Sequence, residues 1–118
     1  MSDTNNFVVR RPRYKVIEGN TSRVWLENAD SSFDARLVDF SRMGSQVELG
    51  VPLAVGEVFQ LRIRVEASSL DIILPAVLRW QRPVGDGTWA TECEFQEEVA
   101  YEVVVELFLG GLLSTEEE

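Results

Sequence analysis

The sequence predicts a small all-β domain, an antiparallel barrel or sandwich, followed by one C-terminal helix. In Phe59–Val65 every odd position is apolar and every even position is polar, which is the pattern of a half-buried strand. After Phe95 the apolar period changes from two to about four, which is typical of a helix. The chain has 118 residues, 45% of them apolar and 26% charged. This length and composition allow one hydrophobic core and one domain.

Seven segments between residues 14 and 95 are expected to be strands, because turn-forming stretches rich in Gly, Asn, Asp and Pro separate them. The last segment repeats the alternation and places Cys93 among apolar neighbours, so this lone cysteine is interpreted as a small core residue. Pro75 interrupts another segment and predicts an edge or a bulge there. Trp25 and Trp89 are assigned to the core or to the barrel ends. The expected strands are Tyr14–Ile17, Arg23–Asn28, Ala35–Phe40, Ser45–Leu49, Phe59–Val65, Ile72–Trp80 and Trp89–Phe95.

An amphipathic helix is predicted over about residues 97–109. Its apolar positions recur every four residues, and acidic residues form a separate stripe. These positions are Val99, Val103 and Leu107 for the apolar face and Glu98, Glu102 and Glu106 for the acidic stripe. The helix should end at Gly110-Gly111, where glycine can adopt the left-handed conformation. We interpret it as a lid on one barrel end or as a partner-binding face, and residues 114–118 as a frayed acidic tail.

Composition excludes most enzyme chemistry. The chain has no His and one Cys, so it lacks the commonest general base and metal ligand and any thiolate cluster. We therefore expect no enzyme activity, no metal and no cofactor. Glu92 and Glu94, two apart on one strand face, are the catalytic alternative, as a hydrolase pair, but no nucleophile with an evident base accompanies them.

The charge balance bears on partners and location. The 11 Lys and Arg against 20 Asp and Glu give a formal net charge of -9. This argues against a surface that binds DNA, RNA or an anionic membrane. Residues 1–6 are polar, and no apolar run approaches the length of a membrane span. We expect a cytoplasmic protein without membrane insertion.

Four of the basic side chains nevertheless lie within six residues. They are Arg10, Arg11, Arg13 and Lys15. Pro12 stiffens this segment, and its side chains can converge on an anion or a planar base. The alternatives are a solvated leader that keeps the N-terminus soluble, and non-specific nucleic-acid binding, which the net charge opposes.

The second notable segment is Asp39–Gly44, at the end of an expected strand. The Asp39 carboxylate can accept two hydrogen bonds from the N–H edge of guanine, and the Ser41 hydroxyl can reach a phosphate or the base. Gly44 permits a backbone geometry or a close approach that other residues forbid. Alone, the segment is more typical of an Asx-type turn.

Together, an arginine-rich segment and a following Asp-x-Ser-x-x-Gly motif resemble the PilZ domain family. The resemblance extends over most of the chain and includes Ser45–Leu49, the Pro52–Glu57 turn, Ala76–Trp80 and Glu94-Phe95. It implies a six-stranded antiparallel Greek-key β-barrel followed by a helix. It divides the chain into a flexible leader (1–9), one domain (10–113, with the barrel at about 14–95 and the helix at about 97–109) and an acidic tail (114–118).

Many PilZ domains are bacterial receptors for cyclic di-GMP, and the resemblance implies the ligand residues. Arg10 and Arg11 would be base and phosphate ligands, Lys15 a weaker phosphate ligand, Asp39 and Ser41 guanine or phosphate contacts, and Gly44 a geometric requirement, with Arg13 and Arg42 as further candidates. Lys15 stands where the family usually has a second Arg. Arg13 is a substitute for it, although we expect its side chain to point to the opposite side of an extended segment.

Two more positions bear on the site. Glu92 stands where the family often has Gly, and its carboxylate would repel a phosphate if it faced the site. Arg79-Trp80 falls close to a recurrent family position, but we interpret Trp80 as core and Arg79 as solvated.

The resemblance implies a single-domain bacterial receptor that binds cyclic di-GMP, reorders its N-terminal segment and regulates a separate effector protein. The alternative is a PilZ-like barrel without nucleotide binding that acts as a protein-interaction module, through the stripe of Glu98, Glu102 and Glu106 or an exposed strand edge. The sequence leaves open the nucleotide stoichiometry, the regulated process and the oligomeric state.

Overall fold

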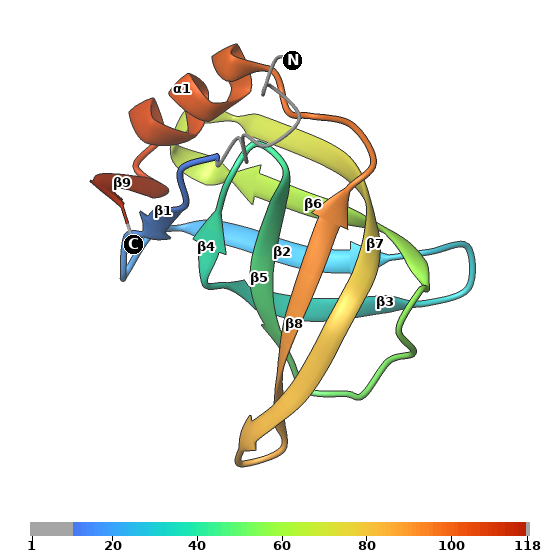
Figure 1. The fold of residues 1–118 in the computed structure, drawn as a ribbon. Helices are drawn as coiled ribbons and strands as arrows, with labels where there is room; N and C mark the ends of the chain where they lie inside the picture. Colours follow the sequence, from blue (N-terminus) through green and yellow to red (C-terminus); the bar gives the residue numbers. More distant parts are fainter. Residues whose placement is uncertain (1–10, 118) are drawn as a thin grey trace, which may run out of the picture.

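The computed structural model describes residues 11–117. Six antiparallel strands form a closed barrel in the order β2-β3-β5-β8-β7-β6, and a separate sheet has the order β4-β1-β9 (Figure 1). The strands are β1 (Tyr14–Val16), β2 (Ser22–Glu27), β3 (Ser32–Leu37), β4 (Asp39–Phe40), β5 (Gly44–Leu49), β6 (Val58–Val65), β7 (Leu70–Gly85), β8 (Thr88–Phe95) and β9 (Leu113–Glu117). A short 3-10 helix, Glu66–Ser68, precedes β7, and the helix α1 spans Tyr101–Leu109.

The barrel is a Greek key, because β5 pairs with β8 and β2 with β6 across connections that skip strands. This confirms the expected fold class. The first expected strand is an exception: β1 pairs with β4 and β9 and lies outside the barrel, whose strands begin at Ser22.

Strand alternation explains the core. In β6 the odd positions Phe59, Leu61, Ile63 and Val65 are each at most 2% exposed, whereas the even positions Gln60–Arg64 face outward. Burying each such side chain contributes about 1.5–3 kcal/mol. Cys93 is 2% exposed in the same core, as predicted, and burial raises the pKa of its thiol to about 12, with the nearby Glu92 charge adding to the effect.

Pro75 lies neither at a bulge nor on an edge strand, contrary to expectation. It pairs with Gln60 of β6 in unbroken register, and β7 has a neighbour on each side. The β8 ladder ends at the Ala76–Phe95 pair, and the Pro75 carbonyl accepts a bond from the Gln96 N–H. In a strand, the N–H and C=O of one residue point to the same side. The nitrogen of Pro75, which has no N–H, therefore faces β8 just beyond the last pair of the β7–β8 ladder, so no ladder hydrogen bond is lost.

Trp25 is buried, but on the outer surface of the barrel rather than in its core. The guanidinium groups of Arg23, Arg62 and Arg64 lie 4.4, 5.0 and 5.4 Å from its ring centroid. Its indole N–H donates to Glu27 at 2.7 Å. Arginine side chains covering the ring therefore account for its 5% exposure.

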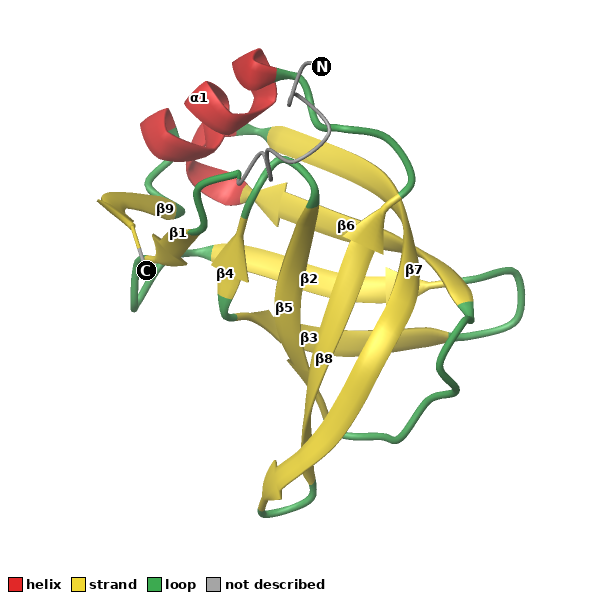
Figure 2. Cartoon of the chain, in the orientation of Figure 1, coloured by secondary structure: helices red, strands yellow, loops and turns green. Residues whose placement is uncertain are grey.

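The helix α1 lies across one end of the barrel (Figure 2). Its Val104 and Leu107, with Leu112 and Leu113 beyond it, join the barrel core, which confirms the interpretation as a lid. It ends at Gly110 as predicted, and Gly111 has a φ of 81°.

The helix begins at Tyr101, four residues later than predicted. The Val99 N–H donates to the carbonyl of Arg42, and the Val99 carbonyl accepts from Arg42 Nε at 2.7 Å. These bonds hold Val99 in the connection between β8 and α1. Val99 is therefore apolar because it packs into the core from this loop, and not because it belongs to the helix.

The expected acidic tail is also different, because residues 113–117 form β9 against β1. The Ile17 N–H donates to the Leu112 carbonyl at 2.8 Å, and Lys15 Nζ lies 4.0 Å from Glu116. Glu has little strand preference of its own and fills two of the five positions of β9, so the strand depends on the β1 edge that it pairs with.

Removing residues 114–118 should therefore lower the melting temperature and speed amide exchange in β1. The lost β1–β9 ladder bonds are worth about 0.5–1.5 kcal/mol each. Thermal denaturation and hydrogen exchange measure both effects. The matched variant Glu116→Gln keeps the ladder and loses only an exposed ion pair, so it should melt close to the parent. Equal stability of the shortened and parent chains would indicate that the tail is frayed.

Candidate functional site

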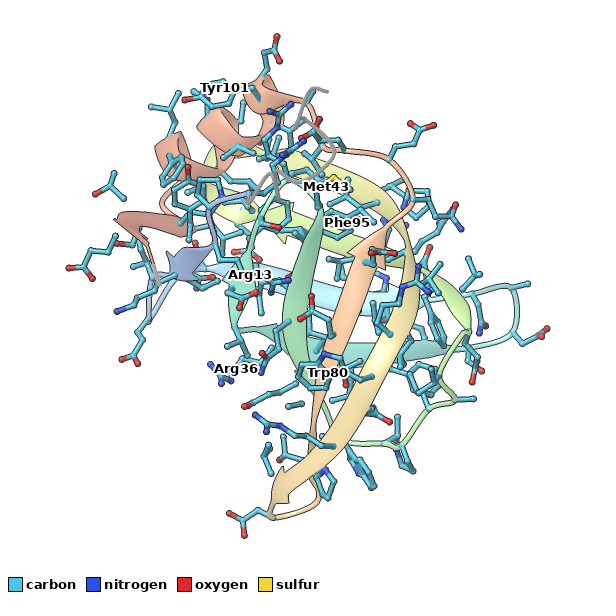
Figure 3. The ribbon with its side chains drawn as sticks, viewed as in Figure 1. Arg13, Arg36, Met43, Trp80, Phe95 and Tyr101 are labelled. Carbon is cyan, nitrogen blue, oxygen red and sulfur yellow. The ribbon has the colours of Figure 1, made fainter. Side chains whose placement is uncertain are left out.

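The basic segment and the Asp-x-Ser-x-x-Gly turn meet on the outer surface of the barrel, and Arg13 joins them. Arg13 Nη1 donates to Asp39 Oδ1 at 2.8 Å and to Glu92 Oε1 at 3.2 Å, and Nη2 pairs with Glu92 Oε2. Figure 3 shows Arg13 lying over the strands in front of the barrel. Burial disfavours the charged guanidinium, but the Glu92 hydrogen bond and the two carboxylate charges outweigh it and raise the pKa of Arg13.

The prediction that Arg13 would point away was wrong. Arg13 and Lys15 are two residues apart, so their side chains share one face of an extended segment. Lys15 lies opposite Asp39 in the β1–β4 ladder, but its ammonium is near Glu116 and its side chain is 54% exposed. Arg13, rather than Lys15, is thus the basic residue that contacts the turn.

Asp39 is the buried centre of this arrangement. Its side chain is 5% exposed, and Oδ1 accepts bonds from Arg13 and from the Gln46 N–H at 2.9 Å. The Ser45 hydroxyl donates to the Asp39 carbonyl. Among residues 11–117, no hydrogen bond is found to the second oxygen, Oδ2.

Ser41 shapes the turn. Its Oγ accepts from the N–H groups of Met43 and Gly44, both at 3.1 Å, and donates to the Gly44 carbonyl at 3.0 Å. Ser41 is 3% exposed. The Ser41 hydroxyl therefore has the role expected of a turn residue, and it fixes the loop between β4 and β5.

Gly44 is required by close approach rather than by a left-handed backbone. A Cβ at this position would lie 2.7 Å from the Cys93 carbonyl oxygen and 3.6 Å from Arg13 Nη2. Any side chain would push β5 from β8, with which Gly44 pairs through Glu94. The predicted geometric role is thus a steric one.

Arg11 and Arg42 form a second cluster, around Glu98. Arg11 Nε donates to Glu98, and Arg42 Nη1 lies 3.8 Å from the same carboxylate. The hydrogen bond from Arg11 lowers the pKa of Glu98, so this group stays ionised at neutral and mildly acidic pH. Arg10, the remaining predicted ligand, lies outside the described residues.

Glu92 faces the site, and Arg13 neutralises it. Glu94 pairs instead with Arg79, so the two carboxylates that suggested a hydrolase have different partners. Within residues 11–117 no group of three or more His, Cys, Asp or Glu could hold a metal ion. No described helix is long and apolar enough to cross a membrane.

Trp80 lies on the outer surface beside Glu92, not in the core as predicted. The register of β7 against β8 shifts between Leu78 and Trp80, which makes Arg79 an extra residue. The shift turns Trp80 outward, opposite Glu92, with 39% of its area exposed (Figure 3). Alternation alone cannot reveal such a bulge, and an indole at this place offers a stacking surface.

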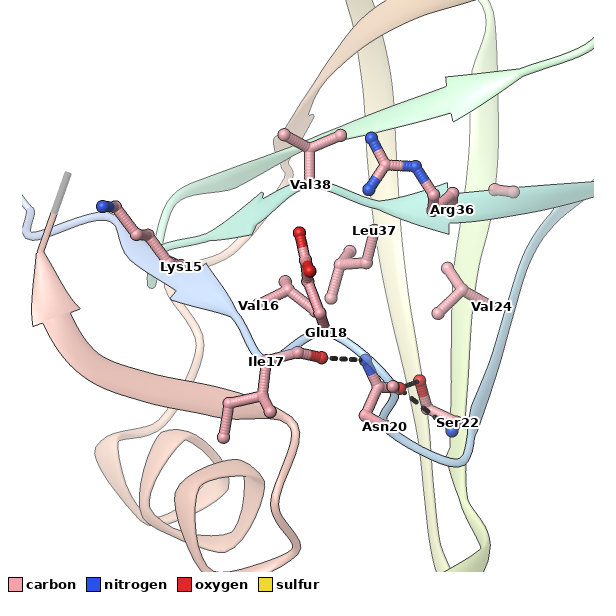
Figure 4. Close-up of a pocket in the computed structure, with 12 residues that line it drawn as sticks. Lys15, Val16, Ile17, Glu18, Asn20, Ser22, Val24, Arg36, Leu37 and Val38 are labelled. Carbon is pink, nitrogen blue, oxygen red and sulfur yellow. Dashed lines mark hydrogen bonds between the residues drawn. The ribbon is translucent and has the colours of Figure 1, made fainter.

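A cavity of about 550 Å³ lies next to this surface, between the β1–β2 connection and β3 (Figure 4). Lys15 and Arg36 border it, together with Glu18 and apolar side chains that include Val24 and Leu37. Of the predicted ligand residues within 11–117, only Lys15 lines it. The arginines at positions 11, 13 and 42 therefore lie outside the lining of this cavity.

The sequence matches the PilZ domain family model over residues 10–109. The chain belongs to the PilZ domain family. The confirmed family accounts for the barrel order and for the approach of the arginine-rich segment to the Asp39–Gly44 turn.

Solved structures share the fold. The structure of the K. pneumonia MrkH-c-di-GMP complex superposes with a TM-score of 0.64 at 13% identity, covering 87% of this chain and 53% of that one. The structure of the Bacillus subtilis inhibitor of motility (MotI/DgrA) gives 0.61 at 20% identity, covering 86% and 50%. The PilZ chain thus spans about half the length of each. No curated protein matches it significantly.

Arg13→Ala should destabilise the fold, because it removes one of the two hydrogen bonds that the buried Asp39 carboxylate accepts within residues 11–117 and also removes the positive charge beside Glu92. The expected loss is about 1–3 kcal/mol in the free energy of unfolding, measured by urea denaturation. Arg79→Ala removes a half-exposed pair with Glu94 and should cost about 0–1 kcal/mol. Equal losses in the two variants would contradict the central place given to Asp39.

Proposed function

We propose that this PilZ domain is a bacterial cytoplasmic receptor for cyclic di-GMP, which acts by binding and regulates a partner protein. The observation that carries the proposal is the contact between Arg13 and Asp39, which brings the basic segment to the Asp-x-Ser-x-x-Gly turn. The MrkH neighbour is, by its title, a complex with c-di-GMP, which supports this ligand class. The MotI neighbour is titled an inhibitor of motility, which is compatible with regulation through a partner.

The proposed ligand residues have distinct roles. Arg10, Arg11 and Arg13 supply planar guanidinium groups for guanine O6 and N7, for stacking or for a phosphate. Asp39 Oδ2 accepts from the guanine N–H edge, while Oδ1 keeps the turn in place. Ser41 and Gly44 shape that turn, and Arg42 and Lys15 are more distant cations for the phosphates.

Binding would exchange one set of ion pairs for another. In the structure Arg11 and Arg42 face Glu98, and Arg13 faces Asp39 and Glu92. A cyclic dinucleotide brings two phosphodiester charges, which compete with Glu92 and Glu98 for these arginines. The segment before β1 would move, and the released carboxylates would change the outer surface that a partner meets.

Calorimetric titration with cyclic di-GMP tests the proposal. We expect micromolar or tighter binding and no binding of GTP. Arg11→Ala and Arg13→Ala should each weaken binding about tenfold to a hundredfold, since a hydrogen bond to a charged group is worth about 1.5–3 kcal/mol. Arg64→Ala is the matched control, because Arg64 pairs with Asp71 on β7 and should leave the affinity unchanged. Absence of heat with the folded parent chain would refute the proposed receptor.

Glu98→Gln should strengthen binding, because it removes the carboxylate that competes for Arg11 and Arg42. Partly exposed ion pairs are worth about 0.2–1 kcal/mol, so the expected gain is up to about fivefold in Kd. Glu97→Gln alters the neighbouring exposed carboxylate, which makes no ion pair within residues 11–117, and should have little effect. Weaker binding by Glu98→Gln would mean that Glu98 helps to hold the ligand-competent arrangement.

A second candidate is a PilZ barrel that does not bind nucleotide and acts as a protein-interaction module. The observation in its favour is that each described arginine of the site already has a carboxylate partner. The same titration separates the two candidates, because this one requires a folded protein that shows no heat and no change in melting temperature with excess cyclic di-GMP.

A further inference from the structure

One face of α1 carries exposed apolar side chains. Tyr101, Val105 and Leu109 are 61%, 36% and 81% exposed and recur every four residues. The opposite face, with Val104 and Leu107, is buried on the barrel. We name Tyr101, Val105 and Leu109 the α1 stripe. It extends about 12 Å along the helix, at 1.5 Å per residue.

A hollow of about 260 Å³ lies at the C-terminal end of the α1 stripe. It is lined by Ser68, Leu70, Glu106, Leu109 and Gly110. This volume is below the range of about 300–1,000 Å³ typical of small-molecule sites. It suits one apolar side chain of a protein partner, as at the anchor positions of interfaces.

The charge around the α1 stripe is acidic. Glu102 and Glu106 follow one edge of it, and no Lys or Arg occurs in the sequence after Arg82. A second copy of this helix would bring glutamates against glutamates, which disfavours self-association. A partner with basic flanks would meet complementary charge.

We propose that the α1 stripe is the docking surface for an amphipathic helix of a partner protein, with apolar residues at helical spacing flanked by Lys or Arg. The apolar residues would cover the stripe, one side chain would enter the hollow, and the basic flank would face Glu102 and Glu106. The partner helix would be the effector that the proposed function requires. The docking proposal rests on that function only for the control of docking by nucleotide.

The helix α1 contacts the proposed nucleotide site at two points. The Arg42 guanidinium lies 5.9 Å from the Tyr101 ring centroid, and Arg42 also bonds the Val99 carbonyl just before the helix. Tyr14, which follows Arg13 in the chain, packs its ring edge-on against Phe108, with the two ring centroids 4.9 Å apart. Movement of the basic segment or of Arg42 would therefore change the contacts that position α1.

Selection from a phage-displayed library of random peptides of about 18 residues, long enough for a helix, tests the docking surface. The full chain is the bait, with and without cyclic di-GMP. The comparison variant is Tyr101→Gln with Leu109→Gln, which keeps helix-forming residues and removes the most exposed apolar area. Ile73→Thr is the matched control, because Ile73 is a 50% exposed apolar residue on β7.

We expect enriched peptides with apolar residues at helical spacing and flanking Lys or Arg. Their affinity, measured by fluorescence anisotropy, should fall at least tenfold for the double variant and stay unchanged for Ile73→Thr. Acidic or unpatterned peptides, equal binding to the double variant, or no enrichment would overturn the proposal. The proposal would also be overturned if sedimentation showed that the parent chain is a dimer and the double variant a monomer, because a second copy would then cover the α1 stripe. Failure of the proposed function is read separately, as absent calorimetric heat with cyclic di-GMP.

Discussion

The carboxylate of Asp39 is the constraint on which this structure depends. It is buried, and a buried charge is costly unless it is paired and hydrogen-bonded. Its bonds to Arg13 and to the Gln46 N–H fasten the segment before β1 and the start of β5 to β4. Tyr14 then enters β1, which carries β9 on its other edge and meets Phe108 of α1. Parts of the chain far apart in sequence thus share one anchor.

This anchor also gives the site its electrostatic character. Three arginines, at positions 11, 13 and 42, face three carboxylates, those of Asp39, Glu92 and Glu98, on a chain with a net charge of -9. A phosphate that binds one of these three described arginines must therefore displace the carboxylate that the arginine already contacts. On the proposed function, recognition and the change of surface are the same physical event, because each arginine taken by a phosphate releases a carboxylate.

Sequence patterning predicted the barrel strands and the end of α1, because alternation and the Gly110-Gly111 pair are local signals. Sequence patterning failed where contacts between residues far apart in the sequence determine the local structure. The bulge at Arg79 turns Trp80 outward, and the Arg42 backbone holds Val99 out of the helix. The two motifs lie together in the structure, but the choice of Arg13 over Lys15 as the contact to Asp39 depends on where β1 pairs, which spacing within the segment does not encode.

Amide hydrogen exchange, measured with and without saturating cyclic di-GMP, tests whether the Asp39 anchor couples these segments, because it reports on each segment that the anchor joins. We expect altered protection in residues 11–16, in the turn 39–46 and in the connection 96–101, with the β2–β6 face around Trp25 unchanged. Exchange that responds only around the cavity between the β1–β2 connection and β3, or in no segment, would contradict it.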